Sequence, residues 1–187
     1  MRTLAAILAV VAGLAGSCRG AAVTDAGPPK TKDKTVMSGN GTLRDVVDNA
    51  IQKPTEYAGL ELDYARGHDL SGVTHFHVNA AGAYTLSSRV TRDEQEHSWS
   101  GTLDAADRDA LLRAMRDSAL LDVPSSTRNM ADDEEPILVT VSYQELVHEL
   151  EVWHDDAGPS GFHRFEEHVV ALTKKLSGGV ILTIPAR

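Results

Sequence analysis

The sequence predicts an α+β fold, in which one antiparallel sheet of about five to seven strands carries two or three helices on one face. Two observations support this prediction. Stretches in which apolar and polar residues alternate, as in strands buried on one side, fill the middle of the chain. A predicted hairpin is twice followed by a stretch whose apolar residues have helical spacing. Helices on one face of the sheet would bury both sets of apolar residues.

The first predicted element is a short helix from Thr42 to Gln52. Thr42 belongs to the residue types that cap helix N-termini. The apolar residues after it have helical spacing and fall on one side of the helix: Leu43, Val46, Val47 and Ile51. Pro54 predicts the end of this helix, because the residue before a proline disfavours helical backbone.

Four strands are predicted next from the alternation of apolar and polar residues. They are expected at Leu60–Tyr64, Thr74–Asn79, Ala83–Val90 and Glu96–Leu103. The segment Ala80-Ala81-Gly82 predicts a hairpin turn between the second and the third. A helix from Asp104 to about Ser118 follows, with Asp104 as its N-cap and Asp107 three residues later, as in a capping box.

The last third of the chain predicts a loop, a second hairpin and a long helix. The loop is polar and acidic and runs from Ser125 to Glu135, and the hairpin begins at Pro136. Alternate residues of the hairpin predict one face: Ile137, Val139, Val141 and Tyr143, then Leu146, His148, Leu150 and Val152. The strongest helical pattern covers Ser160–Leu176, with Gly178 as the stop. A last edge strand is a candidate at Val180–Ile184.

An apolar segment begins the chain and stops at its only cysteine, Cys18. Arg2 precedes a run from Leu4 to Gly16 without charged side chains, which is typical of a secretory signal peptide. The run is shorter than the about 20 residues that a membrane-spanning helix needs. The predicted organisation is therefore a signal peptide at 1–17, a flexible tether at 18–41 rich in Gly, Pro, Lys and Thr, and one α+β globular domain at 42–187.

Leu14-Ala15-Gly16-Ser17-Cys18 resembles the lipobox of bacterial lipoproteins. The resemblance implies that the signal peptide is cut before Cys18, that the Cys18 thiol receives a diacylglyceryl group, and that acyl chains such as palmitate anchor the protein to a membrane. The family favours leucine three residues before the cysteine, where this chain has Ala15. Arg19 is not the acidic residue that commonly signals inner-membrane retention, so the outer membrane is the expected destination.

A competing cleavage site lies a few residues further along. Gly20-Ala21-Ala22 also offers the small residues that an ordinary signal peptidase accepts. Cleavage after Ala22 would remove Cys18 and release a secreted or periplasmic protein. The location of the protein therefore depends on which peptidase acts on the first 22 residues.

Composition excludes several classes of site and partner. The chain of 187 residues has a formal net charge of −9 at pH 7, so no nucleic-acid partner is expected. Because Cys18 is the only cysteine, the domain has no disulfide and no cysteine-ligated zinc or iron–sulfur centre. We expect it to be held together by packing alone, without a cofactor.

From Leu60 to Gly179 the layout of the chain resembles an uncharacterised domain of bacterial lipoproteins and secreted proteins. The residues that carry this resemblance are Gly72, Thr74-His75-Phe76-His77-Val78, Gly82-Ala83-Tyr84, Gly101-Thr102-Leu103, Leu111-Leu112 and Pro136. Members often have a cysteine pair in the first hairpin, and this chain has none. The resemblance implies no activity.

His75 and His77 are the leading candidates for metal ligands. Residues two apart on a strand share a face, so both imidazoles can meet one ion, with His97 as a candidate third ligand. The simpler interpretation is that they decorate the polar face opposite Phe76 and Val78. Because local spacing fixes no third ligand, no metal site is predicted.

The other candidate sites also have simpler structural interpretations. The run Asp132–Glu135 lacks the ligand spacing of a calcium loop and is expected to be solvated, and His154-Asp155-Asp156 is typical of a turn. Gly158-Pro159-Ser160-Gly161 is not a nucleophile elbow, and Ser160 is better explained as a helix cap. The remaining candidates are Ser98 and Ser100 near His97, the carboxylates Glu96, Glu149 and Glu151 for glycosidase chemistry, and Trp99 and Trp153 as a binding platform or core residues. No catalytic residue is predicted.

The leading expectation for function is a membrane-anchored lipoprotein of the bacterial envelope that binds an envelope protein or another envelope component, or assists assembly, without catalysis. One alternative is an envelope hydrolase that uses histidine and carboxylate residues. Another is a secreted inhibitor that inserts the loop Ser125–Glu135 into a partner. A cleft with two or more of His75, His77, His97 and His154 would favour the hydrolase, whereas an exposed apolar or aromatic patch would favour binding.

Overall fold

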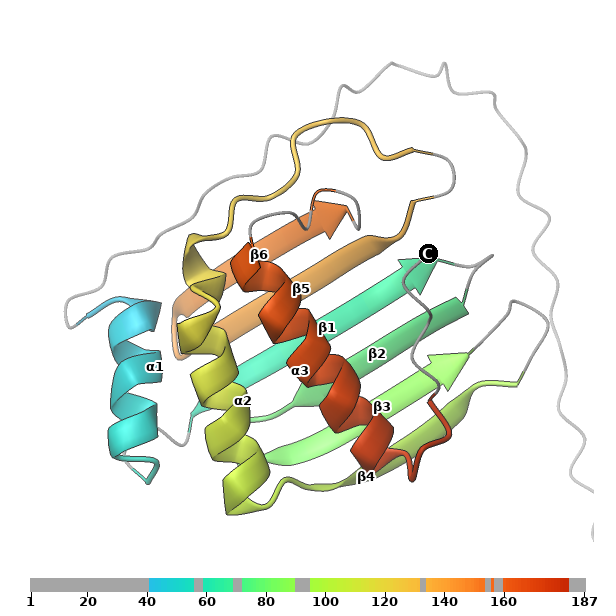
Figure 1. Ribbon diagram of the computed structural model, residues 1–187. Coiled ribbons are helices and arrows are strands. Elements are labelled where there is room, and N and C mark those ends of the chain that lie inside the picture. Colours follow the sequence, from blue (N-terminus) through green and yellow to red (C-terminus); the bar gives the residue numbers. More distant parts are fainter. Residues whose placement is uncertain are drawn as a thin grey trace, which may run out of the picture. The chain divides into compact units, whose positions relative to one another are not determined.

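The computed structural model describes residues 41–55, 59–68, 72–89, 95–131, 134–153, 156 and 160–181. They form a six-stranded antiparallel sheet with three α-helices on one face, which confirms the predicted α+β class (Figure 1). Cys18, the lipobox-like segment, the predicted tether and the competing cut at Ala22 lie outside the described residues. Within the described residues, no helix combines the length and the apolar character needed to span a membrane.

The sheet joins a four-stranded meander to a hairpin. The strands are β1 (Leu60–His68), β2 (Gly72–Val78), β3 (Ala83–Arg89), β4 (His97–Thr102), β5 (Pro136–Tyr143) and β6 (Leu146–Trp153). Their order across the sheet is β4-β3-β2-β1-β5-β6. After β4 the chain crosses the sheet as a helix and returns on the free side of β1, where β5 pairs antiparallel to it. The two edges of the sheet are therefore β4 and β6.

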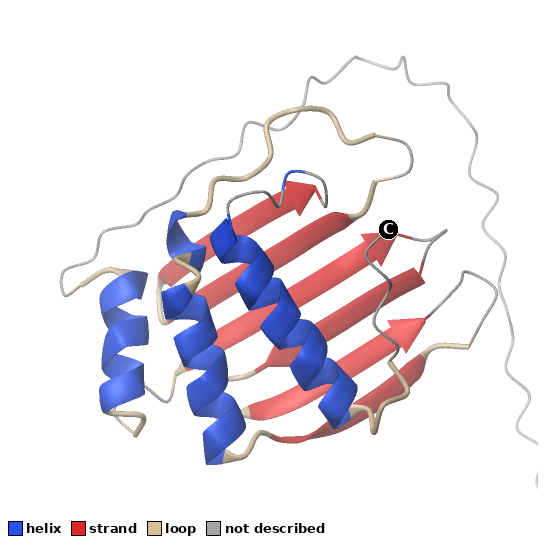
Figure 2. Ribbon diagram, viewed as in Figure 1, coloured by secondary structure: helices blue, strands red, loops and turns tan. Residues whose placement is uncertain are grey.

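The register of the strands separates an apolar face from a polar one. Tyr64 lies opposite Phe76 on one side and Val139 on the other, and all three are buried beneath the helices. Alternate residues of the same strands, such as Asp63 and Thr140, point to the other face because side chains alternate along a strand. No described element covers that face, which we call the open face (Figure 2).

The helices are α1 (Leu43–Gln52), α2 (Ala105–Asp117) and α3 (Ser160–Leu176), with a 3₁₀ turn, η1 (Leu120–Asp122), after α2. α3 crosses the sheet, and α2 and then α1 lie beside it (Figure 1). The residues of α3 that the pattern assigns to its buried side are buried: Phe162, Phe165, Val169 and Leu172. The ring of Phe165 meets that of Tyr64 edge-on, with centroids 6.4 Å apart. Burial of each such side chain stabilises the fold by about 1.5–3 kcal/mol.

The N-caps predicted at Thr42 and Asp104 and the stop predicted at Gly178 are confirmed. The backbone N–H of Thr42 donates to the Asp45 carboxylate at 2.7 Å while the Thr42 hydroxyl accepts from the Asp45 N–H, which completes a capping box. Asp104 accepts from the Asp107 N–H at 2.7 Å, and this hydrogen bond lowers the pKa of the Asp104 carboxyl. Gly178, with φ +66°, follows α3 as the predicted stop.

Two strand predictions need correction. β1 continues to His68, four residues beyond the predicted end at Tyr64, because its pairing with β2 extends to that residue. Arg66 and His68 occupy the next two positions where the alternation calls for apolar residues, so the pattern ended early. The candidate edge strand at Val180–Ile184 is wrong for Val180 and Ile181, which are not in a strand, and its other residues lie outside the described residues.

Candidate functional site

Three titratable side chains meet on the open face, where β1 and β2 pair. Asp63 lies directly opposite His77, and His75 lies two residues earlier on the same face of β2. The Nε2 atom of His75 is 2.5 Å from one oxygen of Asp63, and the Nδ1 atom of His77 is 3.1 Å from the other. One carboxylate therefore binds two imidazoles, an arrangement that the spacing of the histidines alone did not predict.

This histidine–aspartate cluster is accessible to water. The side chains of His75, His77 and Asp63 are 49%, 34% and 42% exposed. Such exposed pairs contribute little to stability, because water competes for the same hydrogen bonds. Imidazoles oriented by a carboxylate can donate and accept protons, so the cluster is able to act as an acid or a base toward a bound molecule. No group of three or more His, Cys, Asp or Glu residues in the described part of the chain is arranged to hold a metal ion.

A shallow hollow of about 240 Å³ lies beside His75 on the open face. The residues around it are His75, Thr85, Leu86, Ser87, Ser98, Trp99 and Ser100. On the open face, most of the side chains that line the hollow are small and carry a hydroxyl group, namely Thr85, Ser87, Ser98 and Ser100. Ser87 lies between the other two strands, opposite His75 on one side and Ser98 on the other. Of the histidines proposed as a cleft, only His75 borders this hollow among the described residues, so the hollow does not meet the expectation for a hydrolase.

The structure separates His97 from the other two histidines. His97, the first residue of β4, is paired with Ser88 of β3. This pairing places the His97 side chain on the helix-covered side of the sheet, away from His75 and His77. There it stacks on Trp99, with ring centroids 6.1 Å apart. The suggestion that His97 provides a third metal ligand is therefore wrong, because the strand register assigns it to the opposite face. His154 lies outside the described residues.

The structure separates Glu96 from the other two carboxylates proposed for glycosidase chemistry. Glu149 and Glu151 lie on the open face of β6, opposite Thr140 and Leu138. Glu96 precedes β4, and the strand order puts β4 and β6 at opposite edges of the sheet. A pair of carboxylates flanking one glycosidic bond needs a separation of about 5–10 Å, which six strands spaced about 4.8 Å apart exceed.

The acidic loop differs from the solvated segment that was predicted. The Glu134 carboxylate is buried and forms an ion pair with Arg128, which also binds Asp156 at 2.8 Å. Ser126 donates its backbone N–H to the Glu151 carbonyl, and its hydroxyl accepts the Trp153 N–H at 3.0 Å. The start of the loop is thus fastened to the β6 edge, while residues 127–131 are exposed. Asp132 and Asp133 lie outside the described residues.

Sequence reasoning missed a buried ionic network beneath α3. Arg66, on the apolar face of β1, donates to Glu166 of α3 at 2.5 Å and to Glu135 at 3.1 Å. His163 lies 3.4 Å from Glu166 one turn earlier in α3. Burial opposes the charge of Arg66, but Glu166 and Glu135 more than offset it and hold the pKa of Arg66 above its ordinary value. The sequence did contain one signal of this network. Arg66 follows Tyr64 by two residues, so it occupies the next position of the strand that faces the core, where a charged residue needs a partner.

A small apolar group on the open face lies at the β5–β6 end of the sheet. Leu138 is 45% exposed, and Pro136 precedes it on the same face. Trp153 lies directly opposite Pro136 and diagonally across from Leu138, and its indole N–H donates to the Arg128 carbonyl at 2.9 Å. Diagonal neighbours on a sheet are about 7–8 Å apart, within reach of an aromatic ring. Trp99, by contrast, packs against the core on the other face.

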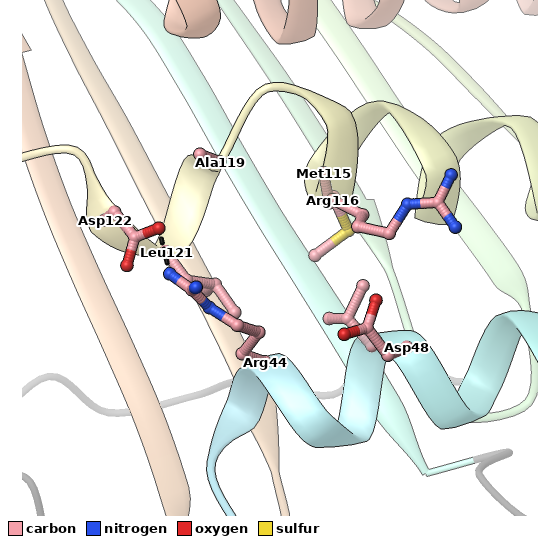
Figure 3. Close-up of a pocket in the computed structure, with 8 residues that line it drawn as sticks. Arg44, Asp48, Met115, Arg116, Ala119, Leu121 and Asp122 are labelled. Atoms are coloured by element: carbon pink, nitrogen blue, oxygen red, sulfur yellow. Dashed lines mark ion pairs between the residues drawn. The ribbon is translucent and has the colours of Figure 1, made fainter.

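A second hollow, of about 210 Å³, lies between α1 and the end of α2 (Figure 3). Two of the residues that line it, Val47 and Met115, are buried, and Arg44 and Asp122 form an ion pair across one side. Asp48 and Arg116 add one charge of each sign to its margin. Balanced charges over a small apolar base are typical of a seam between two packed helices, and none of the residues predicted as a site borders it.

Comparisons with known proteins add no family. No protein-family model and no curated protein matches the chain. Among solved structures, it is similar to a protein from Bacillus halodurans described as a "putative adenylate cyclase", with 14% identity over 76% of this chain and 88% of that chain and a TM-score of 0.20. A similarity of this size supports no statement about activity, so function must be argued from the residues of this chain.

Proposed function

We propose that this protein is a lipid-anchored component of the bacterial envelope that binds another envelope component, or assists its assembly, without catalysis. The observation that carries the binding role is the apolar group on the open face, formed by Pro136, Leu138 and Trp153. Leu138 is exposed while Pro136 and Trp153 are partly buried, and apolar residues gathered in one surface group can mark a contact with a partner. The lipobox-like segment ending at Cys18 supports the anchor, with the outer membrane as the favoured location.

The anchor predicts a specific effect of replacing Cys18. We expect Cys18→Ala to abolish incorporation of labelled palmitate and to reduce membrane-bound protein strongly, because two or more acyl chains are needed to hold a protein stably on a membrane. The measurement is fractionation of cells with fatty-acid labelling. Ser17→Gly, which keeps a small residue before the cysteine, is the matched control and should stay labelled. Unlabelled wild-type protein in the soluble fraction would instead support cleavage after Ala22.

The binding role predicts that the open face carries the contact. We expect Leu138→Glu to reduce cross-linking to the neighbouring envelope component at least several-fold, because it places a charge in the apolar group. Met130→Glu is the matched control, since Met130 is similarly exposed, at 42%, in the loop before β5. The readout is chemical cross-linking in cells, with thermal unfolding to verify that each variant is folded. An equal effect of both variants would count against the open face as the binding surface.

One observation favours the hydrolase alternative, namely the pairing of Asp63 with two imidazoles. The two functions differ in their dependence on this cluster. If the protein hydrolyses an envelope component, Asp63→Asn should abolish that activity while cross-linking persists. If it is a binding protein, Asp63→Asn should leave cross-linking unchanged and no hydrolysis should be detected with the wild-type chain.

A further inference from the structure

The two edges of the sheet differ in how they are protected. Along β6, the loop that contains Ser125 and Ser126 bonds to the backbone of Glu151 and Trp153 and covers that end of the edge. Along β4, no described residue pairs with the outer side of the strand. An open edge presents unpaired N–H and C=O groups that another strand can bind.

The hydrogen-bond pattern shows which groups of β4 point outward. The N–H of Leu103 donates to the Gly82 carbonyl at 3.0 Å, which makes these two residues a hydrogen-bonded pair at the end of the β3–β4 ladder. In an antiparallel ladder such pairs recur at every second residue. The backbone groups of Gly101, Trp99 and His97 therefore face β3. Those of Ser98, Ser100 and Thr102 are directed away from the sheet.

The composition of β4 contains none of the devices that usually keep a sheet edge from pairing. The strand reads His-Ser-Trp-Ser-Gly-Thr and lacks lysine, arginine, aspartate, glutamate and proline, although 24% of the whole chain is charged. Natural proteins protect open edges with such residues, with bulges or with covering segments. The side chains of its outward-directed residues are small and neutral, so a second strand can approach closely.

We infer that β4 pairs antiparallel with β4 of a second copy of this chain, about a two-fold axis at Ser100. In this register Ser100 lies opposite Ser100 of the second copy, and Ser98 lies opposite Thr102 of the second copy. Every outward-directed backbone group of one copy then meets an outward-directed group of the other. The two six-stranded sheets become one continuous sheet.

The side chains on the helix-covered side favour a second copy over an unrelated strand. The same register places Trp99 opposite Gly101 of the second copy, in a position where Cα atoms approach to about 4.5 Å. Gly101 has no side chain, and the Tyr84 ring lies over it, since a Cβ there would come within 2.9 Å of that ring. Trp99 is only partly buried within one copy. Pairing therefore places Trp99, the largest side chain of β4, beside Gly101 of the second copy and against the Tyr84 ring that lies over it.

The charges that flank β4 predict how salt affects the pairing. Glu96 comes opposite Asp104 of the second copy, and these like charges repel. Lys175, whose Nζ atom is 3.8 Å from an Asp104 oxygen, offsets part of the repulsion. Added salt screens exposed charges, so we expect the dimer to strengthen between low and physiological ionic strength.

Cysteine cross-linking tests the register directly. The test uses the full-length chain in which Cys18 is replaced by alanine, so that Ser100→Cys introduces its only thiol. The Cα atoms of the two paired cysteines at the two-fold axis would be about 5.5 Å apart, within the range for a disulfide. The matched control is Thr85→Cys, which lies opposite Ser100 one strand further in. Two Thr85 residues would be roughly 14 Å apart across the same dimer. We expect a disulfide-linked dimer with Ser100→Cys and none with Thr85→Cys. Absent or equal cross-linking in the two variants would overturn the inference.

A charge exchange supplies a second readout that does not depend on oxidation. Ser100→Asp and Ser100→Lys each place like charges opposite one another at the two-fold axis, so each variant alone should sediment as a monomer in mild detergent. An equimolar mixture should restore the dimer, because the opposite charges then pair. A dimer that persists in either variant, or a mixture that stays monomeric, would contradict pairing at Ser100. Thr85→Asp, one strand inside the edge, should leave the dimer of the otherwise unchanged chain intact.

Discussion

Replacement of Arg66 by methionine is expected to lower the free energy of unfolding by about 3–5 kcal/mol. The side chain of Arg66 is 11% exposed, and its two partners, Glu166 and Glu135, are 6% and 15% exposed. Methionine has a similar length and fills the same space, but it carries no charge and no donor. The variant therefore leaves two largely buried carboxylates without their cation, which is the costly way to break a buried ion pair.

The position of this network explains why its loss should affect the whole domain. Arg66 belongs to β1, at the centre of the sheet, while Glu166 belongs to α3 and Glu135 precedes β5. The three residues thus link the covering helix to both halves of the sheet.

Burial, followed by the Glu166 charge, also raises the pKa of neighbouring Tyr64, so its phenol stays neutral at all physiological pH values.

Urea unfolding of the full-length chain measures the effect, and a triple variant separates charge from packing. Arg66→Met combined with Glu135→Gln and Glu166→Leu removes the charges together, so it should recover most of the lost stability. A loss below about 1 kcal/mol in the single variant would mean that water reaches the carboxylates and that the network contributes as weakly as a surface ion pair. Failure of the triple variant to recover would indicate that Arg66 acts through packing rather than through charge.

The second large effect is expected for Gly67→Ala, at roughly 3 kcal/mol. Gly67 lies in β1 with φ +103°, a conformation that residues with a side chain rarely adopt. A Cβ at this position would lie 2.0 Å from the Gly72 carbonyl oxygen in the backbone of the paired strand. The substitution therefore combines backbone strain of about 1–3 kcal/mol with a contact that only a shift of β2 can relieve.

Two other glycines separate these contributions. Gly82 has φ +79° but open space around its Cβ position, so Gly82→Ala tests the backbone conformation alone. Gly161 has an ordinary φ but would place its Cβ 2.4 Å from the Ser118 carbonyl oxygen, so Gly161→Ala sets the close contact against the about 1 kcal/mol by which alanine favours a helix. Urea unfolding should show the largest loss for Gly67→Ala. If Gly82→Ala costs as much as Gly67→Ala, the contact with Gly72 has no energetic weight.

The helices and most strands were predictable because their signals are local. Thr42 and Asp104 cap the helices that follow them with hydrogen bonds to residues three positions later. The apolar spacing of Phe162, Phe165 and Val169 likewise identifies the buried side of α3 within one stretch of chain. The errors occurred where the local signal is weak, as in β1 beyond Tyr64, whose continuation depends on pairing with β2 rather than on its own residues.

The candidate site was only partly predictable, because it depends on which residues of different strands become neighbours. The two-residue spacing of His75 and His77 assigned them to one face, and this is confirmed. That they share Asp63, 12 and 14 residues away, follows from the register of β1 on β2. The register of β4 on β3 places His97 on the other face of the sheet and so excludes it from the cluster. A shift of one residue would have reversed either result, and no single strand encodes its own register.

By itself the sequence determined the α+β class, the helix boundaries and the apolar face of the strands with clear alternation, such as β5, since all of these depend on residues close together in the chain. The lipobox-like segment at Cys18 is also a feature of the sequence alone, and the location it implies stays a prediction. Only the tertiary structure decided the strand order, the burial of Arg66 between two carboxylates and the difference between the sheet edges, where a loop bonds to the end of β6 but no described residue pairs with the outer side of β4. The physical reason is that pairing, burial and exposure are relations between distant segments, and they are established only when the chain closes on itself.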